Sequence, residues 1–239
     1  METREEPSYS LRVHPFPGGG GGSRFALRAL DELWVAVLEM AAMVESALHK
    51  ATNAFVDRRL DLADEVKRKE PEIDRLEVRI EEACLKVLAL HQPVASDLRR
   101  VTTVFKVNGL LERMADLALN IAKRVKKLQG VSLPADLSGE LEALARDALT
   151  QVRDSLDALA GRNAANGRAV RERFPELNRR RRSLTRKIKR EIIAAPDRID
   201  DWLLLINTAR NFSRVAEHAS GIAENAVYLC EGKIIRHAT

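Results

Sequence analysis

Residues 66–90 read VKRKEPEIDRLEVRIEEACLKVLAL, and this stretch decides the class of fold. Apolar side chains recur at every seventh position, with further apolar residues between them: Val66, Ile73, Ile80 and Val87, joined by Leu76, Ala83 and Leu90. A seven-residue apolar repeat places such side chains along one seam of a long α-helix, as in a coiled coil. Proline lacks a backbone donor and restricts the residue before it, so Pro93 is expected to end this helix.

The helical pattern continues on both sides of this stretch. Apolar residues recur at three- and four-residue steps before it, and again after Pro93, where Ser96 or Asp97 is a candidate N-cap. Gly130 and Pro134 then end a first unit of three helices. Beyond them, three more stretches carry the same pattern, at residues 141–159, 177–192 and 202–226.

The second half repeats the first in its residues as well as in its pattern. Glu70-Pro71-Glu72-Ile73-Asp74 is matched by Phe174-Pro175-Glu176-Leu177-Asn178, and Glu112-Arg113-Met114-Ala115-Asp116 is matched by Ser213-Arg214-Val215-Ala216-Glu217. Two signals in the same order indicate an internal duplication. Short links between long helices make the neighbours antiparallel. The sequence therefore predicts an all-α protein of two tandem three-helix bundles, over residues 24–130 and 131–239.

Composition agrees with packed helices. Of the 239 residues, 45% are hydrophobic and only 4% aromatic, which favours helices joined through aliphatic seams. Residues 1–23 include PFPGGGGGS, and this Gly- and Pro-rich segment is expected to be a flexible tail. No run approaches the roughly 18 apolar residues that a spanning helix needs, and the start lacks a secretory signal. We therefore expect a cytoplasmic protein without membrane insertion.

Carboxylates line two of the predicted helices. Glu70, Asp74, Glu77 and Glu81 share one helical face, and Glu112 and Asp116 are four residues apart on the next helix. Like charges at this spacing repel, and two such rows on adjacent helices repel more unless a cation lies between them. Oxygen ligands without His or Cys suit hard cations. The alternative is a solvated acidic face that balances basic surface elsewhere.

The basic residues concentrate in one segment. Residues 168–190 hold eleven Arg or Lys against Glu172 and Glu176, a net charge of +9, so the rest of the chain, at +5 overall, carries −4. Three interpretations stay open at this point: a solvated face, a docking surface for an acidic partner or for the acidic first repeat of a second subunit, and a nucleic-acid contact. Nucleic acid is the least favoured of the three, because the chain has no recognition motif and few aromatic residues.

Three stretches together resemble one known family. They are Gln92-Pro93-Val94-Ala95-Ser96-Asp97-Leu98-Arg99, Leu111-Glu112-Arg113-Met114-Ala115-Asp116 and Asn120-Ile121-Ala122. They are similar to the PhoU family of phosphate-transport regulators, and the similarity covers about residues 24–237. The resemblance implies a cytoplasmic, dimeric, non-enzymatic adaptor. Such an adaptor restrains phosphate uptake and phosphate-starvation signalling by contacting the ATPase subunit of the phosphate ABC transporter and a phosphate-sensing histidine kinase.

The same resemblance implies a metal site in the first repeat. Some PhoU-like proteins hold metal clusters on acidic pairs from two helices, and the matching ligands here are Glu70, Asp74, Glu112 and Asp116. The implied cofactor is a divalent or trivalent ion such as iron, Mn, Mg or Ca. The corresponding positions of the second repeat are Phe174, Asn178, Ser213 and Glu217, so we expect a site in the first repeat only.

A carboxylate-bridged metal enzyme is the alternative from another functional class. Sites of that kind place Glu-x-x-His pairs inside a bundle, whereas Glu45 and His49 are four residues apart here. The sequence also lacks a phosphate-binding loop and a nucleophile–base pattern. We therefore expect no catalytic residues.

Overall fold

The computed structural model describes residues 24–131 and 133–236, so the predicted tail at 1–23 lies outside the described residues. Within them the fold is helical, without a strand, as predicted. The elements are α1 (Arg24–Val56), α2 (Leu60–His91), α3 (Ala95–Val125), η1 (Lys126–Leu128), α4 (Ala135–Ala160), α5 (Ala164–Ala194), η2 (Pro196–Arg198) and α6 (Ile199–Glu231). No helix in this part of the chain has the length and apolarity needed to cross a bilayer.

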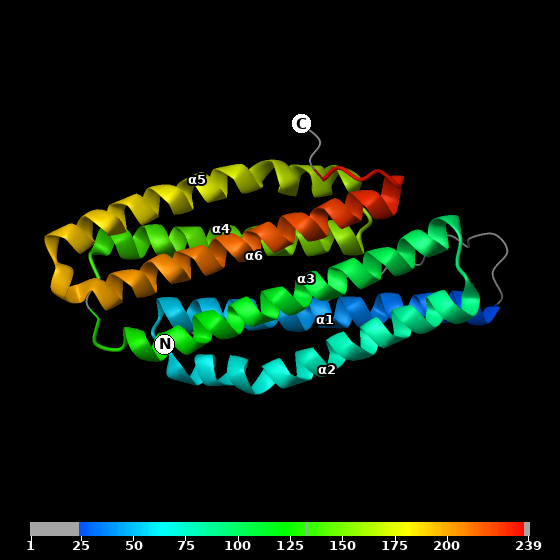
Figure 1. The fold of residues 1–239 in the computed structure, drawn as a ribbon, viewed down its shortest axis with the longest axis horizontal. Coiled ribbons are helices and arrows are strands. Elements are labelled where there is room, and N and C mark those ends of the chain that lie inside the picture. Colours follow the sequence, from blue (N-terminus) through cyan, green and yellow to red (C-terminus); the bar gives the residue numbers. More distant parts are fainter. Residues whose placement is uncertain (1–23, 132, 237–239) are drawn as a thin grey trace, which may run out of the picture.

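The six helices form two antiparallel three-helix bundles that lie side by side (Figure 1). Helices α3 and α6 run next to each other along the middle, and α2 and α5 occupy the two outer edges. Helix α1 also contacts α4, so the bundles share one continuous apolar core. The rings of Phe55 and Phe212 meet edge to face at 6.1 Å and join the first bundle to the second.

Two local features differ from the simplest expectation for the sequence. Helix α2 runs through Pro71 without a break, and α5 does the same at Pro175. Both prolines are exposed, so the carbonyl that each leaves without a donor lies at the solvent side of its helix. Helix α3 begins at Ala95 after Val94, which gives no side-chain cap, so the prediction of Ser96 or Asp97 as N-cap was wrong.

A carboxylate is buried where the two bundles meet. Glu45 on α1 is almost fully buried, and its Oε1 atom has no hydrogen-bond partner among the described residues. Burial raises the pKa of Glu45, Asp157 on α4 raises it further, and Arg153 on α4 opposes the shift. The native state therefore holds a proton on Glu45 more tightly than the unfolded chain does.

We predict that Gly167→Ala destabilises the protein by about 1–3 kcal/mol. A Cβ at this position of α5 would stand 2.8 Å from the Ala223 carbonyl oxygen and 2.9 Å from Val227 Cγ2 on α6, so the two helices would have to separate. The matched control is Gly139→Ala on α4, where a Cβ meets nothing within 4 Å. That change should stabilise by about 0.5–1 kcal/mol. Urea unfolding of both variants measures the difference, and equal effects would contradict the close packing.

We also predict that Glu45→Gln stabilises the protein above neutral pH. Because the folded pKa lies above the ordinary value of 4.5, wild-type stability falls as pH rises from that value through the folded pKa. Glutamine carries no charge, so thermal unfolding between pH 5 and pH 8 should show a higher midpoint at pH 8 and a weaker dependence on pH. Glu39→Gln, on the exposed side of α1, is the control and should leave the profile unchanged.

Candidate metal-binding site

The predicted acidic residues lie along the junction of α2 and α3. Glu70 and Asp74 lie on α2, and Glu112 and Asp116 lie on α3, which packs against α2. Burial raises the pKa of Glu70, and the charges of Asp74 and of Asp116 on the facing helix raise it further. Lys123 only partly offsets them. The two acidic rows therefore act on each other across the helix pair.

The carboxylate of Glu112, on α3, is subject to the same repulsion between negative charges. Its pKa is raised by burial first, then by Asp116 on its own helix and by Glu77 and Asp74 on α2. Arg113 lowers it by less. Within the described residues none of the four predicted ligands forms an ion pair. Their mutual repulsion is thus left without a protein counter-ion in direct contact.

An amide lies beneath these carboxylates. Asn108 is buried on α3, one turn before Glu112, and its Nδ2 donates to the Glu77 carbonyl oxygen at 2.9 Å. Its Oδ1 atom is buried and has no hydrogen-bond partner among the described groups. A buried carbonyl-type oxygen beside unneutralised carboxylates is a donor that a hard cation accepts. The donor chemistry here therefore fits an oxygen-ligated metal ion.

The side chains nevertheless spread along the face. In the part of the chain that the structure describes, no three Asp, Glu, His or Cys side chains stand close enough together to hold one metal ion. Asp74 and Asp116 are exposed, and Glu70 and Glu112 are half-buried. These side chains would have to rotate to share a cation, and the structure leaves the predicted ligand set untested.

The second bundle has different chemistry at the matching place. Phe174 packs on the core, Ser213 is buried, and the Asn178 Oδ1 atom accepts hydrogen bonds from Nε and Nη2 of Arg181. Counting from the paired prolines, Arg181 stands where the first bundle has Glu77. Burial lowers the pKa of Arg181, and the charges of Arg182 and Arg210 lower it further. The junction of α5 and α6 is therefore locally basic where the junction of α2 and α3 is acidic.

Ion pairs that the sequence analysis missed hold much of the basic segment. Arg173 pairs with Asp154 at 2.5 Å, Arg180 pairs with Asp147 at 2.5 Å, and Lys187 pairs with Glu140, so three bridges join α5 to α4. On the other side Arg168 pairs with Glu231 and Arg171 with Glu224, which joins α5 to α6. The segment thus serves in part to fasten α5 to its two neighbours.

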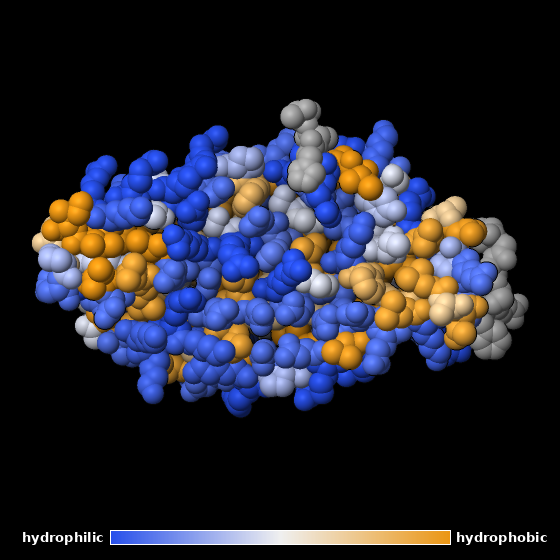
Figure 2. Space-filling model, in the orientation of Figure 1, coloured by the Kyte–Doolittle hydropathy of each residue, from blue (hydrophilic) through white to orange (hydrophobic). Residues whose placement is uncertain are grey.

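Hydrophilic side chains cover most of the middle of the face shown in Figure 2, and apolar side chains gather at its two ends. The exposed large apolar residues include Val94, at the link from α2 to α3, and Ile193 and Ile199, at the link from α5 to α6. The Gln92–Arg99 stretch, one of three that carried the family resemblance, forms the first of these links with its residues 92–94 and the start of α3 with the rest.

Comparison with known proteins agrees with this architecture. The model of the PhoU domain matches twice, at residues 37–125 and 141–226. A protein of Rhizobium meliloti named phosphate-specific transport system accessory protein PhoU homolog is 33% identical, over 82% of this chain and 83% of its own length. The Escherichia coli PhoU protein is 28% identical, over 87% of this chain and 86% of its own.

Solved structures agree as well. The crystal structure of PhoU from Pseudomonas aeruginosa superposes with a TM-score of 0.83 at 29% identity, covering 86% of this chain and 99% of that one. PhoU from Streptococcus pneumoniae gives a TM-score of 0.79 at 25% identity, covering 88% and 99%. With two matched domains, relatives over most of its length and the same duplicated helical fold, the chain belongs to the PhoU family.

Proposed function

We propose that this protein is an accessory regulator of phosphate transport. The observation that carries the proposal is the pair of PhoU domains, which together span most of the chain, in a protein whose relatives are named accessory proteins of the phosphate-specific transport system. Those relatives align over more than four-fifths of both chains, so the similarity involves the whole two-bundle body.

The regulator acts through contacts and catalyses no reaction. In this proposal it works in the cytoplasm as a homodimer, and it contacts the ATPase subunit of the phosphate transporter and the phosphate-sensing kinase. The names of the relatives support an accessory role, and the ion pairs between α5 and its neighbours argue against a nucleic-acid function. Basic side chains already paired with carboxylates have less to offer a phosphate backbone.

The metal-binding part of the proposal rests on the junction of α2 and α3. Glu70, Asp74, Glu112 and Asp116 would hold one or more divalent or trivalent cations such as iron, Mn, Mg or Ca. The mutual repulsion across α2 and α3 and the unpartnered Oδ1 atom of Asn108 support it. A bound cation would neutralise the acidic face and hold the two helices together.

The regulatory role predicts a defined phenotype. Clean deletion of the gene in the source organism should raise the uptake of labelled phosphate and switch on phosphate-starvation genes under phosphate-rich conditions. Re-expression of the full chain should restore both to the wild-type level. Unchanged uptake and unchanged expression in the deletion strain would refute the proposed role.

The metal site predicts a difference between the two repeats. Asp116→Asn and Glu112→Gln should each weaken metal binding by about tenfold or more, because each removes a charged oxygen ligand. Glu217→Gln, at the position of the second repeat that matches Asp116, should leave it unchanged. Elemental analysis of the purified variants, followed by calorimetric titration with Mn²⁺ and Mg²⁺, measures this. Equal metal content in all three variants and the wild type would rule out the site.

A further inference from the structure

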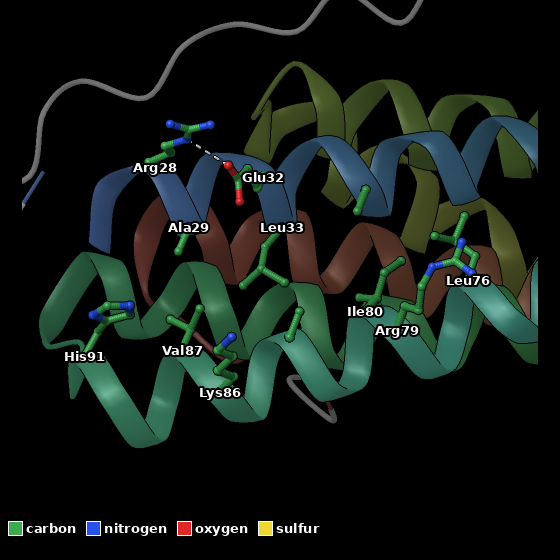
Figure 3. Close-up of a pocket in the computed structure, with 12 residues that line it drawn as sticks. Arg28, Ala29, Glu32, Leu33, Leu76, Arg79, Ile80, Lys86, Val87 and His91 are labelled. Atoms are coloured by element: carbon green, nitrogen blue, oxygen red, sulfur yellow. Dashed lines mark hydrogen bonds and ion pairs between the residues drawn. The ribbon is translucent and has the colours of Figure 1, made fainter. Parts of the chain in front are cut away.

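A groove runs between α1 and α2 on the outside of the first bundle. Its main cavity has a volume of about 630 Å³, with a floor of Leu33 on α1 and of Leu76, Ile80 and Val87 on α2. Figure 3 shows the side chains of Leu33, Ile80 and Val87 lying between the two helices. A second cavity of about 320 Å³ continues along the same pair of helices past Met43 and Ile73. The groove therefore follows α1 and α2 for much of their length.

Ion pairs bridge the matching groove of the second bundle, between α4 and α5. The family domain begins at Val37 in the first repeat and at Leu141 in the second, and Pro71 matches Pro175, so α1 and α2 align with α4 and α5 at the same shift of 104 residues. At this shift Ala36 and Ala83, which line the open groove, match Glu140 and Lys187.

Glu140 and Lys187 form an ion pair across α4 and α5. Seven residues further along α1 and seven residues back along α2, Met43 and Leu76 match Asp147 and Arg180, which pair at 2.5 Å. Apolar and small residues thus stand in the first bundle at these two bridge positions. The third bridge, between Arg173 and Asp154, matches Lys69 and Lys50, and there Lys50 pairs with Glu65 across α1 and α2. Among the described residues the main cavity therefore has no ion pair across it, whereas the far end of the second cavity has one.

The α2 rim of the main cavity is basic, whereas the second cavity is lined by Lys50 on α1 and by Glu65, Lys69 and Glu72 on α2. Arg79 and Lys86 line the α2 side, and neither forms an ion pair with another described residue. On the α1 side of the main cavity stands Glu32, which is paired with Arg28. Arg79 and Lys86 can therefore receive a negative charge from a bound partner.

We propose that this groove binds an amphipathic helix of a partner protein. A helix fits because the space between two antiparallel helices is the place where a further helix of a bundle packs. Its apolar stripe would cover the floor, and over the main cavity an acidic flank would face Arg79 and Lys86 while a basic flank would face Glu32. Along α1 the two cavities extend from Arg28 to Lys50, which corresponds to a helix of about 20 residues.

This inference deepens the proposed function, because it names the face through which a partner of the transport system is contacted. It depends on that function for the identity of the partner only. The binding of a helix of the stated charge pattern can be measured without it.

The probe is a fluorescent synthetic helix of about 20 residues with a leucine stripe, glutamates on one flank and lysines on the other. Fluorescence anisotropy with the full chain should show saturable binding. The variant Ala36→Glu with Ala83→Lys installs the bridge of the second bundle and should weaken binding at least tenfold while the protein melts normally. Binding that is absent from the wild type, or equal in the bridged variant, would overturn the proposal.

A charge-reversal series guards against an effect of folding alone. Lys86→Glu should weaken the probe several-fold and should favour a second probe in which the acidic residues of the α2-facing flank are replaced by lysines. Lys189→Glu makes the same change of charge on the exposed side of α5 and should affect neither probe. Equal responses of the Lys86 and Lys189 variants would show that only net charge matters and would refute the groove.

Two further readouts separate this inference from its neighbours. Sedimentation should show that the bridged variant has the same oligomeric state as the wild type. Loss of a dimer in the variant would mean that a second copy of the chain fills the groove, and it would overturn the assignment to another protein. In the deletion strain, the bridged variant should fail to restrain phosphate uptake. Full restoration by this variant would refute the groove while leaving the regulatory role intact. Probe binding combined with unchanged uptake in the deletion strain would refute only the regulatory role.

Discussion

The packing of α3 against α6 is the contact on which the rest of the molecule depends. This contact joins the two bundles in one core, and it needs a small residue where the helices approach closely. Gly221 on α6 leaves room for Leu110 on α3, because a Cβ at Gly221 would stand 3.2 Å from the Leu110 Cδ1 atom. Lys106 lies 5.1 Å from the ring centroid of Tyr228, which adds a cation–π contact between the same helices. With α3 and α6 fixed in the middle, α2 and α5 are held at the edges, and each edge presents its own charge.

Much of this could be predicted from the sequence, because the signals involved are local or periodic. Six helices and their antiparallel order follow from apolar spacing and from the internal repeat, and carboxylate spacing places Glu70 and Asp74 on the helix next to that of Asp116. The ion pairs between α4 and α5 were missed because the charges of residues 168–190 were summed along one helix, while the carboxylates that answer them lie on another. The sequence does contain a pattern that indicates these ion pairs. Acids at 140, 147 and 154 and bases at 187, 180 and 173 both recur every seven residues, in the register of antiparallel helices. Convergence of side chains on one ion could not be predicted, because it depends on rotamers and not on spacing.

The two bundles share the same helical arrangement but differ in the contacts that hold their outer helices in place. Helix α2 buries seven residues against its neighbours, whereas the longer run of polar residues in α5 leaves only five buried. A helix with a thinner apolar seam gains less from burial, so contacts of another kind must help to hold it in place. Each partly exposed ion pair contributes at most about 1 kcal/mol, but several that act between the same helices fix their register. The charged residues of α5 therefore compensate for apolar surface that α2 retains.

This compensation determines which bundle has surface left for ligands. In the second bundle the carboxylates of α4 are used to hold Arg173, Arg180 and Lys187, and the site that matches the acidic face contains a guanidinium. In the first bundle two ion pairs, Lys50–Glu65 and Arg100–Asp31, join α1 to α2 and to α3. The four predicted metal ligands form no ion pair with another described residue, and neither do Arg79 and Lys86 on the groove rim. A duplicated protein can keep one copy as a rigid support and free the other for recognition. The distribution of ion pairs assigns the support to the second bundle, so both proposed binding surfaces lie on the first.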